Sequence, residues 1–301
     1  MSQAVMNPSL PAIGPNEFRL FRELIHRHTG IWLRDGKQVM LASRLSRRLR
    51  AHRMTSFAEY YRFVDGRRDD GHELGELINC VTTNKTSFFR ELHHFTFLSG
   101  KIISEMMAAA HASPQGDRGA ATSGVRIWSA ACSTGEEPYS IAMTLLEAQQ
   151  RLRWPASASS LSIVASDLDT TVLEKAAHGV YTADEIEGID SSLLKKYFLR
   201  GTDAMAGQVK VKKQLAALVE FERINLMDRA WPVNGSFDAI FFRNALIYFR
   251  QETQDLFLRR MIRYLRPGGY LFLGHSEHIP WLHNVLEPLQ QTIYRLRSAQ
   301  P

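Results

Sequence analysis

Apolar residues between residue 16 and about residue 80 recur every three or four positions, the spacing of one face of an α-helix. Asn16 is placed to cap a first helix, and Gly30 is placed to end it. A second helix is expected from Gly36 to Arg53, with shorter helices at about 56–66 and 71–81. The buried stripe of the second helix comprises Leu41, Leu45 and Leu49. The pattern predicts an all-α N-terminal domain.

From residue 125 onward the pattern changes to short apolar runs that alternate with helical segments. Buried strands are expected at 125–131, 161–167, 237–242 and 269–275. Helices are expected at about 137–151, 173–177 and 252–265. Strands that alternate with helices indicate a parallel sheet with helices on both faces, so the fold class is α/β.

Two segments between residues 197 and 224, VKVKK and LVEFERI, are typical of short strands and have no predicted helix between them. They predict a small antiparallel β subdomain, inserted at about 195–222. Residues 112–124 are small and polar and contain Gly and Pro, which is typical of a linker. We therefore divide the chain into a helical domain (1–90), a connecting helix and linker (91–124), and an α/β domain (125–301).

The composition, 45% hydrophobic and 23% charged, is that of a soluble globular protein. The N-terminus lacks the pattern of a signal peptide, and no run approaches the roughly 18 apolar residues of a membrane helix. Cys80 and Cys132 are too few for a disulfide framework, so we expect a cytoplasmic protein. Residues 1–110 hold 16 basic and 11 acidic residues, so 16 − 11 = +5 of the net charge of +6 lies there. This imbalance suggests an acidic partner.

In a doubly wound sheet, ligands bind at the carboxyl ends of the strands. The first of these ends carries SAACSTGEEPYS, residues 129–140. The turn lacks the glycine and lysine pattern of a phosphate loop, and Glu136 and Glu137 would repel phosphate. A carboxylate here suits a cationic ligand, such as a sulfonium that carries an α-amino group. Alternatively, the two glutamates only complement the helix dipole.

Asp167 ends the second predicted strand, where a carboxylate can accept hydrogen bonds from ribose hydroxyls. Nearby Asp169 is a candidate helix N-cap. Further on, in INLMD (224–228), Asn225 and Leu226 can offer an amide and an apolar contact to an adenine. These segments point to an adenosine-bearing ligand.

The last strand end carries FFRNALIYF, residues 241–249. Arg243 and Asn244 leave the strand there, and Tyr248 follows one helical turn later. A lone tyrosine is more often a core residue than a catalytic one. The ordered set of strand ends predicts a pocket for adenosine attached to a group without phosphates, and it resembles the Rossmann-like methyltransferases that use S-adenosylmethionine.

The stretch TTNKTSFFRELHHF (82–95) allows three interpretations: a metal site, a capped helix start, or a pocket wall. Adjacent His93 and His94 would point about 100° apart on a helix and have no His-x-x-x-His partner, so no metal site is expected. Thr86 or Ser87 can start a helix that contains Glu91. Two interpretations of this stretch therefore remain: the capped start of a helix and the wall of a pocket.

This stretch, together with IWSAACSTGEEPYSIAMTL, ASDLDTTVLEKAAHGVY, FDAIFFRNALIYF and RPGGYLFLGHSE, resembles the chemotaxis receptor methyltransferases of the CheR family from about residue 16 to residue 297. The resemblance implies methyl transfer from S-adenosylmethionine to glutamate side chains of bacterial chemoreceptors, giving glutamate methyl esters and S-adenosylhomocysteine. It also implies the domain layout given above. The implied partner is the cytoplasmic domain of the receptors, and a receptor C-terminal peptide at the β subdomain stays open. We expect a monomer.

The same resemblance implies the site residues. Those that would contact the cofactor are Asn84, Thr86, Arg90, Glu137, Asp167, Asn225, Leu226, Arg243 and Asn244. Arg90 and Tyr248 would lie beside the methyl transfer as catalytic residues, while Phe88 and Phe89 anchor the segment by packing. A carboxylate nucleophile is already ionised at neutral pH, since its usual pKa is about 4.3, so no general base is required. A guanidinium such as that of Arg90 suits the alignment of a carboxylate.

The predicted helix from Gly36 to Arg53 contains no acidic residue. Its cations Lys37, Arg44, Arg47 and Arg48 fall within an arc of roughly 100° beside the leucine stripe. They form either an ordinary solvated face or, since receptor helices with methyl-accepting glutamates are acidic, a receptor-docking face. We favour docking.

Two other functions compete with this interpretation. A nucleic-acid methyltransferase would use the basic first third of the chain to bind phosphates. Enzymes that methylate base amines commonly have an Asn/Asp-Pro-Pro-Tyr turn, however, and the run from Asn244 to Tyr248 has no proline. A non-catalytic binding protein is the second alternative, and the complete set of pocket residues argues against it.

Overall fold

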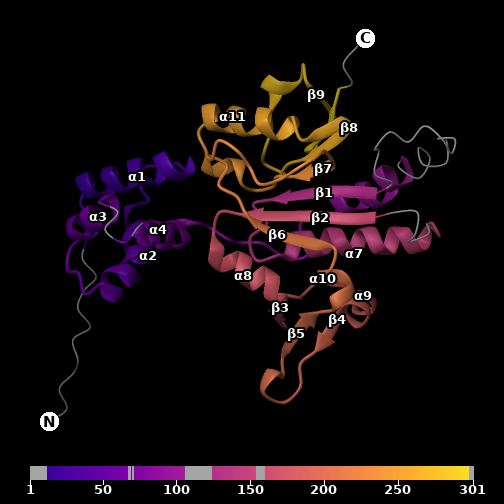
Figure 1. The fold of residues 1–301 in the computed structure, drawn as a ribbon, viewed down its shortest axis with the longest axis horizontal. Helices are drawn as coiled ribbons and strands as arrows, with labels where there is room; N and C mark the ends of the chain where they lie inside the picture. Colours follow the sequence, from indigo (N-terminus) through magenta and orange to yellow (C-terminus); the bar gives the residue numbers. More distant parts are fainter. Residues whose placement is uncertain (1–11, 67–68, 70, 106–123, 154–159, 298–301) are drawn as a thin grey trace. The chain divides into compact units, whose positions relative to one another are not determined.

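The computed structural model describes residues 12–66, 69, 71–105, 124–153 and 160–297. The chain divides into two compact units: Met1–Thr83 with Tyr248–Arg250, and Asn84–Ile247 with Gln251–Pro301. We call the first the helical unit and the second the α/β unit (Figure 1). Within the described residues, no helix is long and apolar enough to cross a membrane.

The helical unit has four helices in its described part: α1 (Pro15–Thr29), α2 (Gln38–Ala51), α3 (Phe57–Asp65) and α4 (His72–Val81). All four were predicted, and the stripe of Leu41, Leu45 and Leu49 on α2 is buried. The predicted cap of α1 is wrong, because the helix begins at Pro15 and its N-cap is Gly14, which leaves Asn16 inside the first turn. Gly30 ends α1 as predicted, in the left-handed conformation with a φ of 75°.

The short segment Tyr248–Arg250 completes the helical unit from far along the chain. Ile31 forms an antiparallel bridge with Phe249. The Trp32 amide donates to the Tyr248 carbonyl at 2.9 Å. The guanidinium carbon of Arg250 lies 3.3 Å from the centroid of the Trp32 ring. Backbone pairing and cation–π stacking therefore hold these three residues against the loop that follows α1.

The α/β unit is built on a seven-stranded sheet of order β6-β2-β1-β7-β8-β10-β9. Its strands are β1 (Gly124–Ala130), β2 (Ser160–Asp167), β6 (Val219–Arg223), β7 (Phe237–Phe241), β8 (Leu265–Phe272), β9 (Leu286–Gln290) and β10 (Ile293–Leu296). The strands from β6 to β8 run parallel, and β10 and β9 add antiparallel pairs. The four predicted strands are all present, and the predicted α/β fold class is confirmed. Pro267, Gly268 and Gly269 lie inside β8, at a shift in its register with β7.

Helices cover both faces of the sheet because successive strand residues point to opposite sides. On one face, Ile127 and Ile163 pack with α7 (Glu136–Arg151), α5 (His93–Phe97) and the π-helical η1 (Leu98–Ile102). On the other, Trp128 meets Trp231 and Tyr264. The remaining crossovers are α8 (Thr170–His178) and α11 (Gln251–Ile262).

A second, three-stranded antiparallel sheet of order β3-β5-β4 lies apart from the main one (Figure 1). Its strands are β3 (Val180–Thr182), β4 (Phe198–Arg200) and β5 (Gln208–Val211), with α9 (Ser191–Tyr197) before β4 and α10 (Lys213–Ala216) after β5. The β subdomain thus begins earlier than predicted. The second segment assigned to it, LVEFERI, belongs instead to the main sheet, where β6 pairs in parallel with β2. Val219 and Phe221 explain this placement, because they pack on the main core.

The division between units falls after Thr83, not at residue 90. Residues 84–90 belong to the α/β unit because the Asn84 carbonyl accepts a hydrogen bond from Ser133 Oγ at 2.9 Å. In addition, Phe88 packs edge-on against Tyr181 and Phe198. The predicted linker at 112–124 lies outside the described residues except for Gly124, which starts β1.

Candidate functional site

Parallel pairing brings the carboxyl ends of β6, β2, β1 and β7 to one edge of the sheet. At the end of β2, the Asp167 carboxylate accepts hydrogen bonds from the amides of Ser133 (2.9 Å) and Asp169 (3.0 Å). Burial raises the pKa of Asp167. These two amides fix the carboxylate beside the turn that follows β1.

Asp169 is the N-cap of α8, as predicted, because its Oδ1 accepts from the amides of Thr171 and Val172. Its other oxygen accepts from Asn84 Nδ2 at 2.8 Å. This bond ties the start of the TTNKTSFFRELHHF stretch to the end of β2. Asn84 and Asp167, which lie far apart in the sequence, are thereby brought to the same edge.

The turn between β1 and α7 carries the two predicted glutamates. Gly135 is the N-cap of α7 with a φ of 96°, and a Cβ there would lie 2.8 Å from the Tyr181 hydroxyl and 2.9 Å from Ala176 Cβ. Glu136 accepts a hydrogen bond from Thr134 Oγ1 within its own turn. Glu137 instead accepts from Ser129 Oγ (2.7 Å) and from Arg243 Nη1 (3.1 Å). Burial raises the pKa of Glu137, and the charge of Arg243 opposes that rise.

Arg243 and Asn244 extend beyond β7. The Arg243 side chain is almost fully buried, and its guanidinium lies between Glu137 and Glu91, with Nη2 at 3.3 Å from Glu91 Oε2. Nη2 also donates to the Arg90 carbonyl. Asn244 has a φ of 58°, and its amide donates to Glu277 Oε2 at 2.9 Å. The structure thus joins Arg90, Glu137, Arg243 and Asn244 in one network of hydrogen bonds and ion pairs.

Asn225 and Leu226 follow β6, whose Arg223 pairs with Asp167 in the sheet register. Asn225 Oδ1 accepts from the amide of Met227 at 3.0 Å, and the Leu226 carbonyl accepts from Arg260 Nη1 at 2.9 Å. These bonds order the loop next to the end of β2. Both residues lie at the predicted edge.

The predicted helix start within TTNKTSFFRELHHF is wrong. Residues Phe89 and Glu91 have positive φ angles of 52° and 60°, so the chain turns there and α5 begins only at His93. Neither Thr86 nor Ser87 caps a helix. The predicted packing of Phe88 and Phe89 is confirmed, since both contact the core of the α/β unit. Thr86, two positions after Asn84 in the sequence, is half-buried.

The two histidines of this stretch lie closer together than the helical spacing predicted. The rings of His93 and His94 lie 4.1 Å apart between centroids instead of diverging, and both residues can offer a ligand atom within 4.8 Å of one from Glu91. The Arg243 guanidinium lies 3.3 Å from Glu91 Oε2, however, and it opposes a cation at this place. Burial, together with the charge of Arg243, lowers the pKa of His94 to about 3, so its ring is neutral at physiological pH.

Sequence reasoning missed three residues of this network: Glu91, His275 and Glu277. Glu277 Oε2 accepts from the amides of Asn244 (2.9 Å) and Gly274 (2.7 Å). Glu91 Oε1 lies 3.1 Å from His275 Nδ1. The segment GHSE (274–277) carries the signal, because it begins two residues after the end of β8, where another parallel strand reaches the same edge.

The predicted docking face on α2 is only partly free. Arg44 donates to the carbonyls of Val81 and Thr82, and Arg48 forms ion pairs with Glu73 and Glu76. Arg47 is exposed, although its Nε lies 3.0 Å from Cys80 Sγ, and Lys37 is exposed before the helix. Arg44 and Arg48 therefore stabilise the helical unit. Tyr248, the second predicted catalytic residue, lies in the segment that this unit holds through Trp32.

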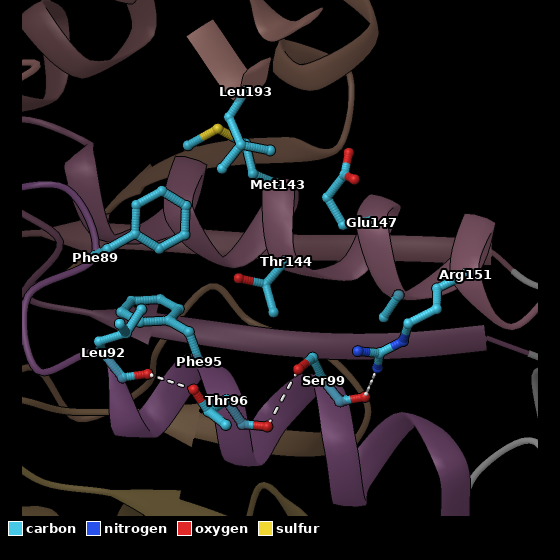
Figure 2. Close-up of a pocket in the computed structure, with 11 residues that line it drawn as sticks. Phe89, Leu92, Phe95, Thr96, Ser99, Met143, Thr144, Glu147, Arg151 and Leu193 are labelled. Atoms are coloured by element: carbon cyan, nitrogen blue, oxygen red, sulfur yellow. Dashed lines mark hydrogen bonds between the residues drawn. The ribbon is translucent and has the colours of Figure 1, made fainter. Parts of the chain in front are cut away.

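A groove of about 380 Å³ runs between α5, η1 and α7 and does not include the predicted cofactor residues (Figure 2). Phe89, Phe95, Met143 and Leu193 give it an apolar lining. At one end Arg151 donates to the Ser99 carbonyl at 2.9 Å. Glu147 is the one carboxylate among the lining residues, so the groove does not offer the set of carboxylates found at the strand edge.

The donors and acceptors at the strand edge fit a ligand with hydroxyls and a cationic amine. Buried carboxylates stand at the ends of β2 and at the start of α7, and a buried guanidinium lies between two of the acidic groups. Glu91 Oε2 and Arg243 Nε are buried without a hydrogen-bond partner among the described residues. Buried polar atoms of this kind are costly unless a group outside the chain, such as water or a ligand, pairs with them. The edge therefore suits S-adenosylmethionine.

Comparison with known proteins agrees with this chemistry. Residues 16–82 match the family described as "CheR methyltransferase, all-alpha domain", and residues 84–295 match "CheR methyltransferase, SAM binding domain". The chain is 44% identical over 278 residues to chemotaxis protein methyltransferase 2 of Pseudomonas aeruginosa, covering 92% of each chain. It is 42% identical over 287 residues to the chemotaxis protein methyltransferase of Escherichia coli strain K12, covering 95% of this chain and 92% of the relative. The chain therefore belongs to the CheR methyltransferases, whose α/β domain binds S-adenosylmethionine.

Proposed function

We propose that this chemotaxis methyltransferase transfers its methyl group to glutamate side chains on the cytoplasmic domain of chemoreceptors, forming glutamate methyl esters. The observation that carries the proposal is the Arg90 segment at the cofactor edge. Arg90 is held by its own carbonyl to Arg243, while its guanidinium makes a single hydrogen bond among the described residues, to the Lys85 carbonyl at 3.0 Å. A half-buried guanidinium with spare donors is suited to receive a carboxylate.

In this proposal the strand edge holds the cofactor. The Asp167 carboxylate accepts from the ribose hydroxyls, Asn225 and Leu226 meet the adenine, and Glu137 accepts from the α-amino group. Asn84, Thr86, Arg243 and Asn244 complete the pocket wall. The cofactor supplies an electrophilic methyl group on its sulfonium. The spacing of acidic and amide groups along one sheet edge supports this assignment.

The substrate carboxylate is ionised at neutral pH and attacks without a general base. The protein's contribution is alignment of the nucleophile, which can be worth roughly 7–11 kcal/mol of the barrier. We assign this role to Arg90 through paired N–H donors. Tyr248 donates a hydrogen bond to the second carboxylate oxygen. Both residues are thus proposed to act on the nucleophile and not on a proton.

Docking to the receptor is proposed to use the exposed cations Lys37 and Arg47 of the helical unit. Arg44 adds its positive charge, because its hydrogen bonds go to neutral carbonyls. The charge of Arg48 is neutralised by Glu73 and Glu76, so we assign it no direct part in docking. Receptor helices rich in glutamate offer the opposite charge, and salt weakens such an attraction.

The function is tested by incubating the full chain with labelled S-adenosylmethionine and receptor membranes and then measuring base-labile methyl ester. We expect label that is released by base and absent when the receptor glutamates are replaced by alanine. Arg90→Ala should lower the methylation rate at least about 100-fold, since alignment of the nucleophile is lost. Label that survives base treatment would show a different acceptor atom. An unchanged rate in Arg90→Ala would refute the role of Arg90.

A further inference from the structure

Glu91 lies at the centre of the network at the strand edge, although it belongs to neither a strand nor a helix. Its Oε1 accepts from the His275 amide at 3.2 Å and from Asn244 Nδ2 at 3.3 Å, and it lies 3.1 Å from His275 Nδ1. Its Oε2 lies 3.3 Å from Arg243 Nη2. One carboxylate therefore binds the residues that follow β7 and those that follow β8.

The backbone at Glu91 is shaped for this contact. A φ of 60° is uncommon for a residue with a long side chain and costs free energy, which the surrounding contacts must offset. The side chain is only 11% exposed. Burial by itself raises the pKa of Glu91, but the charge of Arg243 and the hydrogen bonds from His275 and Asn244 lower it to about 2. The carboxylate is therefore charged at any physiological pH.

We propose that Glu91 is a positioning residue of the cofactor site, which holds Arg243 and Asn244 in place and keeps Glu137 available for the cationic end of S-adenosylmethionine. The inference rests on the proposed assignment of Glu137, Arg243 and Asn244 to that site. Nothing in it requires Glu91 to touch the cofactor.

The physical reason is the sharing of one guanidinium by two carboxylates. Arg243 gives Nη1 to Glu137 and directs Nη2 toward Glu91, so neither carboxylate receives the paired fork that would satisfy it fully. With both glutamates ionised, the three side chains carry a net charge of −1. If Glu91 lost its charge, Arg243 would neutralise Glu137 alone, and the cluster would become neutral.

A net negative cluster favours the cofactor over its product. Both ligands carry the α-amino group that Glu137 accepts from, but only S-adenosylmethionine carries a positive charge on its sulfur. The net negative charge that Glu91 gives the cluster should therefore strengthen binding of the cofactor more than binding of the product. The effect is electrostatic and acts through a buried, poorly screened region. Loss of the Glu91 charge should therefore reduce the difference in affinity between S-adenosylmethionine and S-adenosylhomocysteine.

The test measures the Kd of S-adenosylmethionine and of S-adenosylhomocysteine by titration calorimetry on the full chain. Glu91→Gln keeps the size of the side chain and removes its charge. We expect about tenfold weaker binding of S-adenosylmethionine, the usual scale for a charged hydrogen bond, and a smaller loss for S-adenosylhomocysteine. Glu91→Asp, which keeps the charge on a shorter side chain, should lose less than Glu91→Gln. Glu174→Gln, an exposed carboxylate on α8, is the matched control and should bind both ligands like the wild type.

The variant Glu137→Gln distinguishes a failure of the role proposed for Glu91 from a failure of the cofactor site assigned under the proposed function. If Glu137→Gln weakens cofactor binding while Glu91→Gln binds like the wild type, the role of Glu91 is refuted and the cofactor site stands. If neither variant weakens binding, the assignment of the site itself is wrong. Equal losses for the two ligands in Glu91→Gln, together with a lower Tm of the ligand-free protein, would show a structural role only and overturn the inference.

Discussion

Two arginines in this protein, the partly buried Arg48 and the buried Arg243, are each paired with two glutamates, and their networks differ. In the helical unit, Arg48 pairs with Glu73 and Glu76. In the α/β unit, Arg243 pairs with Glu91 and Glu137. Both clusters contain one arginine and two glutamates. They differ in how many of their buried donors and acceptors have a hydrogen-bond partner.

The network around Glu73 is closed. Its Oε1 accepts from Arg48 Nε (2.8 Å) and the Tyr60 hydroxyl (2.6 Å), and its Oε2 accepts from Arg48 Nη2 and lies 2.8 Å from His52 Nε2. Although burial raises the pKa of Glu73, its bonds to Arg48, Tyr60 and His52 lower it overall. A network with every acceptor filled stabilises a fold and has no capacity left for a ligand.

The network around Arg243 is open. Glu91 Oε2 and Arg243 Nε lack hydrogen-bond partners among the described residues, and several donors come from the ends of strands. The comparison teaches that a buried ion pair does not by itself mark a functional site. Here the two unsatisfied atoms distinguish the network at the strand edge from the closed network around Glu73.

The largest effect is expected from breaking the closed network. Arg48→Ala leaves the Glu73 carboxylate buried without its main partner and should lower the free energy of unfolding of the helical unit by about 3–5 kcal/mol. Chemical denaturation of the full chain, followed by circular dichroism, measures this loss. A loss below about 1 kcal/mol would show that solvent replaces Arg48 easily and that the network is not closed.

The network around Arg243 should make the free energy of unfolding depend on pH through Glu91. A Glu91 pKa of about 2 against its ordinary value of 4.5 means that this carboxylate stabilises the native state above pH 4.5 and loses that contribution as the pH falls toward 2. The loss amounts to about 3 kcal/mol. Unfolding free energies of the wild type and Glu91→Gln should therefore converge between pH 4.5 and 2. Parallel curves would mean that Glu91 is not held by its neighbours.

The smallest effect on stability is expected on the exposed side of α2. Arg47→Ala should change the unfolding free energy by less than about 0.5 kcal/mol, as for most surface residues, yet lower the rate of receptor methylation and its sensitivity to salt. The rate is measured on receptor membranes at two salt concentrations. Arg50→Ala, at another exposed position of the same helix, shows whether docking depends on one cation or on the whole face.

The sequence predicted the strands and the acidic strand ends because both depend on local pattern. Asp167 and Glu137 each stand directly at the end or start of an element that periodicity reveals. The placement of β6 was not predictable in this way, since VEFER alternates equally well in either sheet and only its packing on the main core decides. Arg48 was assigned to a docking face because its partner Glu73 lies 25 positions away, beyond any helical spacing. Glu91 was missed because its position depends on a positive φ.

The helical unit is made from two separate pieces of chain, and this affects how the enzyme can be dissected. Removal of residues 1–83 would leave Tyr248, Phe249 and Arg250 without the bridge to Ile31 and the Trp32 ring that now hold them. A fragment that starts at Asn84 is therefore not an intact S-adenosylmethionine-binding domain from which only the helical unit has been removed. Reduced activity in such a fragment would combine two effects, the loss of the helical unit and the release of Tyr248–Arg250. The docking and catalytic roles proposed above are therefore better separated by point substitutions than by truncation.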